Sequence, residues 1–256
     1  MKLFNFWRNS SRQNRSREQT NDSNALLPGH LAMLEQLRKA ETDDPMVRPR
    51  LAGRVLHDLA CKSAVSNEII KPENLFAALA SNGGFSCLMA AQFETAASGA
   101  ADALTIVETN DGNLYYFGDL PNRYLIESRL SLLSLALGAA QSDGANISLD
   151  IVYQAMRHVA QTIGSEDFGV PQLPALSKPD HLPIDYLQPL WSVFQEALQQ
   201  YEAPPEYWPA SFRFALQDVF AAYKARIDPS TAAQICIEYA VPMAKVDPRR
   251  IAGAFG

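Results

Sequence analysis

The 256-residue sequence has few cysteines and lacks the spacings that mark metal and catalytic sites. Its three cysteines, Cys61, Cys87 and Cys236, are widely separated and odd in number, which is typical of buried thiols in a reducing compartment such as the cytoplasm. No Cys-x-x-Cys pair or Cys/His cluster has zinc spacing, so neither a metal nor another cofactor is expected. No Gly-x-Gly-x-x-Gly, Gly-x-Ser-x-Gly or His-Glu-x-x-His motif occurs, and no enzyme class is therefore indicated.

The chain also lacks an excess of positive charge and a long apolar run. A net charge of −6 argues against nucleic acid as the main partner. The most apolar segment, residues 130–140, is too short and too interrupted by serine to span a bilayer, so no transmembrane segment is predicted. Hydrophobic content of 47% and charged content of 20% are ordinary for a folded soluble protein.

The N-terminus differs from the rest of the chain. An aromatic cluster at residues 3–7 precedes a polar segment in which Lys2 and four arginines against Glu18 leave residues 1–18 with a charge of +4, and the remainder with −10. We predict a disordered basic tail over residues 1–24 and a single mostly helical domain over 25–256, with a subdivision near 164–183 as an alternative. A second interpretation of the tail is a weak anchor on a membrane surface or a partner.

Residues 104–140 are expected to organise the fold. Two apolar runs, 104–107 and 114–118, flank Asp111-Gly112, which is the strongest short-range signal for a β-hairpin. If these two residues form a type I′ turn, Val107 lies opposite Tyr116 and Ile106 opposite Phe117. Both faces of such a hairpin are largely apolar, so it needs cover from helices, a further strand or a partner.

The predicted fold class is mainly α: a multi-helix domain with one central hairpin, at about residues 103–118, packed on a buried helix at about 121–141. Pro121 suits the first turn of that helix, and its second half is apolar nearly all round. Four helices are expected before the hairpin, one of them beginning at Pro72 and ending at a Gly83-Gly84 C-cap. The proline-rich segment 164–183 is expected to form a stiff strap between later helices.

One polar cluster is the main candidate for a functional site. Asp119, Asn122, Arg123 and Glu127 crowd the corner between the hairpin and the next helix, beside several tyrosines. Polar groups next to aromatic rings at such a junction can form a ligand pocket. The competing interpretation, which we favour, is a helix cap with a corner ion pair.

Two weaker candidates involve histidine. His158, Glu166 and Asp167 are residue types that bind metals, although a histidine in the last turn of a helix followed by a solvated acidic loop is the simpler interpretation. His57 and Cys61 lie four residues apart on one helix face and resemble a nucleophile–base pair, but a buried cysteine is usually a small apolar residue.

These observations favour an interaction protein over an enzyme. The first hypothesis is a cytoplasmic, acidic, helical protein of bacterial type that binds another protein, such as a toxin-neutralising immunity protein or a secretion-system accessory. The second is an enzyme with a site near Asp119 and Arg123 or near His158 and Glu166. The third is a peripheral membrane protein anchored by residues 1–17.

Overall fold

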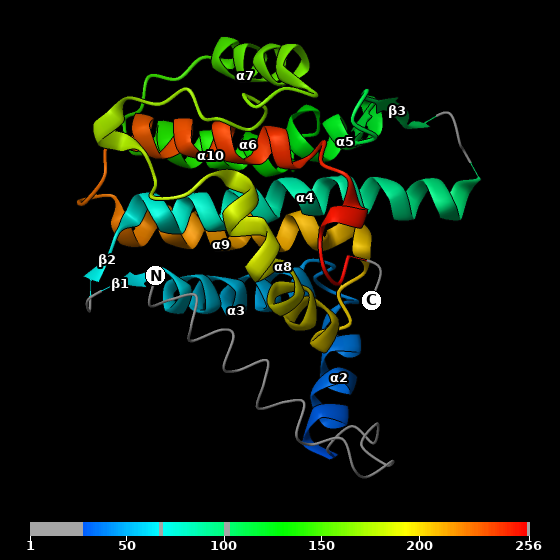
Figure 1. Cartoon of the computed structure of the whole chain (residues 1–256). Coiled ribbons are helices and arrows are strands. Elements are labelled where there is room, and N and C mark those ends of the chain that lie inside the picture. Colours follow the sequence, from blue (N-terminus) through cyan, green and yellow to red (C-terminus); the bar gives the residue numbers. More distant parts are fainter. Residues whose placement is uncertain (1–27, 67–68, 100–102, 255–256) are drawn as a thin grey trace, which may run out of the picture. The chain divides into compact units, whose positions relative to one another are not determined.

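The computed structural model describes residues 28–66, 69–99 and 103–254 (Figure 1). The predicted basic tail, residues 1–24, lies outside this range. The contacts divide the chain into two units, residues 1–43 and 44–256. In the first unit the described helix is α2, Pro28–Ala40, whose last turn carries Arg38 and Lys39, where the helix dipole favours positive charge.

The second unit is mainly α-helical with a β-hairpin, as predicted, and helix α4 (Pro72–Ser98) lies at its centre. Figure 1 shows α4 between α10 on one side and α9 on the other, and both helices pack along it. The helices that contact α4 are α3 (Val47–Ser63), α6 (Leu132–Ser142), α8 (Pro183–Gln200), α9 (Trp208–Tyr223) and α10 (Pro229–Met243), and α7 (Leu149–Thr162) packs on α10. The remaining short elements are β1 (Val65–Ser66), β2 (Ile69–Ile70) and the 3-10 turns η4 (Ala175–Ser177), η5 (Pro205–Tyr207) and η6 (Pro248–Arg250).

Helix α4 corrects the prediction that Gly83-Gly84 ends a helix. It runs without interruption through both glycines for 27 residues, and every residue from Asn74 to Ala91 is buried. A Cβ atom at Gly84 would lie 2.7 Å from the carbonyl carbon of Ala240 in α10. The glycine is therefore a point of close backbone approach between two central helices, which has the same sequence signature as a C-cap.

The hairpin forms where it was predicted, but in a different register. Strands β3 (Thr105–Glu108) and β4 (Leu114–Phe117) are antiparallel, with Ile106 opposite Tyr116 and Val107 opposite Tyr115. The predicted partners were one residue off, so the predicted division of side chains between the two faces is also wrong.

The turn explains the shift in register. The N–H of Thr109 donates to the carbonyl of Asn113 at 3.0 Å, which leaves three residues in the loop instead of two. The N–H of Gly112 donates to the carbonyl of Thr109 at 2.8 Å, and Gly112 has a φ of 77°. A turn followed by a left-handed glycine is the usual three-residue hairpin connection, and Asp-Gly serves it as well as a type I′ turn.

Strand β4 has the cover that its apolar residues require, whereas most of β3 is exposed. Tyr115 forms an isolated antiparallel bridge with Val246, so the segment after α10 extends the sheet beyond β4. The ring of Phe168, from the loop after α7, packs edge-on against Tyr115 with ring centroids 4.7 Å apart.

The predicted helix at 121–141 is broken into two parts. A turn of α-helix, α5 (Asp119–Asn122), continues as a π-helical turn, η3 (Arg123–Glu127), and α6 begins only after residue 131. Ser131 caps α6, since its side chain accepts a hydrogen bond from the N–H of Ser134. Leu133 is fully buried, whereas Leu130, just before the cap, is 53% exposed.

Two further helices begin at side chains of types that commonly cap a helix. The hydroxyl of Ser148 accepts a hydrogen bond from the N–H of Asp150 at the start of α7, and the carboxylate of Asp228 accepts one from Thr231 at the start of α10. The alternative subdivision near residues 164–183 stays a prediction.

Candidate functional site

The four residues of the main candidate cluster do not converge on one point. Arg123 forms an ion pair with Glu94 at the surface, and the hydroxyl of Tyr124 donates to the same carboxylate at 2.6 Å. The hydrogen bond from Arg123 lowers the pKa of Glu94, and burial raises that of Tyr124 to about 12. Asp119 and Glu127 are exposed, and Glu127 lines an open depression with Arg129 and Gln141.

Asn122 points instead to a residue that the sequence did not single out. Its side-chain oxygen accepts a hydrogen bond at 2.8 Å from the ammonium of Lys245, which is only 4% exposed. Burial lowers the pKa of Lys245 to about 8, and the nearby Cys87 and Glu127 oppose that shift weakly. The ammonium also lies 5.4 Å from the ring centre of Phe117. Lys245 thus joins the corner after the hairpin to the end of α10.

The segment after Lys245 supplies a second buried charge. Asp247 is buried and accepts hydrogen bonds from the backbone and guanidinium of Arg249, at 2.7 to 3.0 Å. These bonds outweigh burial and lower the pKa of Asp247. Asp247 caps the 3-10 turn η6, which begins at Pro248, and no sequence signal links this turn to the hairpin.

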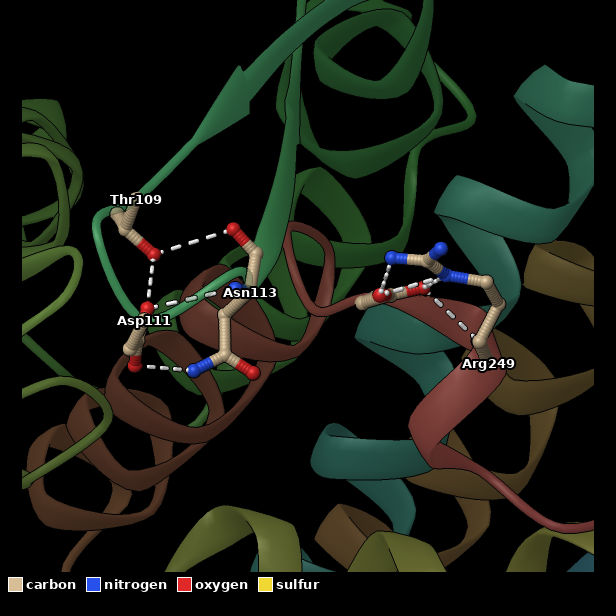
Figure 2. Close-up of polar contacts among 5 residues, drawn as sticks. Thr109, Asp111, Asn113 and Arg249 are labelled. Atoms are coloured by element: carbon tan, nitrogen blue, oxygen red, sulfur yellow. Dashed lines mark hydrogen bonds and ion pairs between the residues drawn. The ribbon is translucent and has the colours of Figure 1, made fainter.

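Figure 2 shows the hairpin turn in the same view as Arg249. The carboxylate of Asp111 accepts hydrogen bonds from the hydroxyl of Thr109 at 2.5 Å and from the side-chain amide of Asn113. The bond from Thr109 is the largest cause of the lowered pKa of Asp111. This network fixes the turn, and through it the direction of the two strands.

The second candidate group, His158, Glu166 and Asp167, does not come together in one site either. Glu166 and Asp167 are exposed, whereas His158 is half-buried and its Nδ1 lies 3.1 Å from the side-chain nitrogen of Gln172. The buried carboxylate near His158 is Glu238 of α10, whose pKa is raised by burial and which accepts the N–H of Gln172 at 3.0 Å. These groups fasten the loop after α7 to α10. Within the described residues, no three His, Cys, Asp or Glu side chains form a group able to hold a metal ion.

The structure brings His57 and Cys61 together in surroundings that disfavour the thiolate. His57 Nε2 lies 3.7 Å from Cys61 Sγ, and its Nδ1 lies 3.2 Å from Asp58 Oδ1. Cys61 is in the last turns of α3, where the helix dipole disfavours a thiolate, and burial raises its pKa. Cys87 is fully buried in α4, so it does not join the pair.

The depression beside His57 is open and shallow. It lies over α3 and α9, and its lining includes Arg54, Asp58 and Asp218. Charges of both signs on an open surface lack the enclosed apolar walls of a small-molecule site.

Comparison of the chain with protein-family models, curated proteins and solved structures found no match. Across the described ranges, no helix is both long and apolar enough to cross a membrane. Among the described elements, strand β3 is exposed at three of its four residues.

Proposed function

We propose that this chain is a protein-binding protein, and that its partner adds an extended segment to the free edge of β3. The observation that carries the proposal is the direction of the backbone groups of Ile106 and Glu108. Those groups form the outer edge of a two-stranded sheet whose other edge is already extended by Val246.

The hydrogen-bond ladder determines that direction. In an antiparallel pair, opposite residues alternate between hydrogen-bonded and non-hydrogen-bonded pairs. Thr109 donates to the carbonyl of Asn113, so the pair two positions along, Val107 and Tyr115, is also a hydrogen-bonded one. Ile106 and Glu108, the residues on either side of Val107, are the non-hydrogen-bonded positions, so their N–H and C=O groups point away from β4.

Tyr116, which lies opposite Ile106, follows the same alternation. Its N–H points away from β3 and donates to the carbonyl of Lys245 at 3.0 Å. The corresponding groups of Ile106 and Glu108 have no backbone partner within the described residues. Such an edge is a template for another strand.

The side chains of β3 leave this edge accessible. Ile106 is 55% exposed, and Thr105 and Glu108 are also exposed. An added strand would cover Ile106 and place its own side chains beside Glu108. The chemistry therefore suits an extended segment with an apolar residue for Ile106 and a basic residue for Glu108.

The overall charge supports the same class of partner. A chain of net charge −6 favours a basic protein over nucleic acid. Two classes of cytoplasmic bacterial protein have this role, toxin-neutralising immunity proteins and secretion-system accessories, and both belong to the proposal.

Replacing Ile106 with proline tests strand addition, because proline removes the outward N–H without removing a bond to β4. We expect Ile106→Pro to keep the unfolding midpoint of the parent and to lose a partner that the parent retains when both are used as bait in the cells of origin. Ile106→Thr removes the apolar side chain but keeps the N–H, and should retain weaker binding.

Val107→Pro is the matched control. Its N–H is directed toward β4, so this variant should lose stability as well as binding. Equal retention of every partner by the parent and Ile106→Pro would exclude β3 as the binding edge.

A further inference from the structure

The connection between α7 and α8 contains a second surface that strand addition does not use. Residues 171–180, here called the clamped loop, have Pro171, Leu173 and Pro179 buried and residues 174–176 exposed. At the centre, the side chain of Leu176 is 98% exposed. A single exposed leucine is ordinary on a protein surface, so exposure alone indicates nothing. The attachment of the loop at both ends is what distinguishes this leucine.

The first end of the clamped loop is attached to α10 and α7. The N–H of Gln172 donates to the buried carboxylate of Glu238 at 3.0 Å, and its carbonyl accepts the side-chain amide of Gln234 at 3.2 Å. The side-chain amide of Gln172 also reaches Nδ1 of His158. Charge-assisted and amide hydrogen bonds therefore hold the backbone on both sides of Gln172.

The second end is attached to the start of α4. The carboxylate of Asp180 accepts hydrogen bonds at 2.7 Å from Asn74 and from Lys71, and its N–H donates to Asn74 at 2.9 Å. The buried hydroxyl of Tyr186 donates to the same oxygen of Asn74. Lys71 additionally donates to the carbonyl of Lys178 at 3.1 Å, only two residues after Leu176.

Between these attachments the chain forms one turn of 3-10 helix, η4, closed by the N–H of Ser177 on the carbonyl of Pro174 at 2.9 Å. The prolines at 171, 174 and 179 restrict the backbone further. A turn of this kind cannot pair as a strand, and it differs from the extended conformation that a protease binds. It presents one apolar side chain on a backbone that is already ordered in the folded protein, so binding a partner would lose little further conformational entropy.

We propose that the clamped loop is a docking element that inserts Leu176 into an apolar pocket of a partner protein, with an acidic group on that partner facing Lys178. Lys178 is exposed and carries the positive charge nearest Leu176 in sequence, which selects a partner of opposite sign at the pocket rim. This partner contact is independent of the edge of β3, which takes a basic segment. The two surfaces therefore differ in both shape and charge preference.

A leucine-sized photo-crosslinking residue at position 176 of the full chain, in the cells of origin, tests the docking element. The matched control is the same residue at position 149 in α7, where the leucine is 54% exposed. We expect a discrete adduct from position 176 and none from 149. A cyclic peptide of residues 171–180 should compete for it, and the same peptide with Leu176→Asp should compete about 30-fold less well.

A variant that weakens the anchoring of the clamped loop, but keeps Leu176, tests whether the rigidity of the loop contributes to binding. Asn74→Ala removes two hydrogen bonds that hold Asp180, keeps the one from Lys71 and leaves Leu176 unchanged. The adduct yield should therefore fall although the chain stays folded by circular dichroism. The proposal is overturned by the absence of an adduct at 176, by equal adducts at 176 and 149, by equal competition from the Leu176→Asp peptide, or by an adduct with a second copy of this chain. Ile106→Pro should leave the adduct unchanged, so failure here is distinguishable from failure of strand addition at β3.

Discussion

Gly84 of α4 lies directly against the backbone of Ala240 in α10, and the two central helices approach more closely there than side chains would allow. Gly84→Ala would place a methyl group against a carbonyl that cannot move without shifting α10. We expect a loss of about 1–3 kcal/mol in the free energy of unfolding, the range for overpacked cores. Urea denaturation measures it.

Gly138→Ala is the control for Gly84→Ala. Gly138 is also inside a helix, α6, but a Cβ atom there meets nothing within 4 Å. Alanine should raise stability by about 0.5–1 kcal/mol, because it lowers the entropy of the unfolded chain without a clash. Equal effects at the two positions would contradict the close approach of α4 and α10.

The buried face of α6 predicts a large cost for emptying one leucine site. Leu133 is fully buried, so Leu133→Ala should cost about 2–5 kcal/mol. Leu130→Ala, at the half-exposed position before the cap, should cost much less. A Leu133→Ala variant as stable as Leu130→Ala would place α6 at the surface of the unit.

Lys245 predicts an unusual dependence of stability on pH. Its folded-state pKa of about 8 is below the value of 10.5 for a free lysine, so the unfolded chain binds more protons between these values. Below about pH 8 the buried ammonium opposes folding, by up to about 3 kcal/mol, and this cost disappears as the pH rises to 10.5.

Lys245→Met isolates that effect from other groups that titrate in the same range. We expect this variant to be more stable than the parent at pH 7, despite the lost hydrogen bond to Asn122, and the difference to shrink by pH 10. Chemical denaturation at both pH values measures it. A difference that is constant with pH would mean that Lys245 keeps its ordinary pKa.

The hairpin turn depends on Gly112, whose φ is 77° although the space around it is open. Gly112→Val should cost about 1–3 kcal/mol, since a β-branched residue resists this conformation. Gly112→Asn should cost less, because asparagine tolerates the left-handed region. Thermal unfolding of the two variants compares them, and similar midpoints would argue against backbone strain as the cause.

The sequence predicted the structure best where its signal was local. Ser148 and Asp228 are of residue types that commonly cap helices and do so here, since a cap needs only a side chain and a nearby N–H. The prediction was wrong about the register of the hairpin because Asp-Gly suits both a two-residue and a three-residue loop. The candidate cluster at 119–127 had no local signal for where each side chain would point, and the structure sends Asn122 to Lys245 and Arg123 to Glu94.

The sequence by itself determined a mainly helical chain with one hairpin, because periodic apolar residues and turn residues act over a few positions. Only the tertiary structure decided that α4 runs through two glycines, that Lys245 is buried beside the hairpin, and that Asn74 and Asp180 hold the clamped loop. Asn74 and Asp180 are 106 positions apart, and no periodicity links them. Contacts of this kind depend on which helix faces pack together. That packing follows from burying the apolar surfaces of all the helices in one core, which no local pattern specifies.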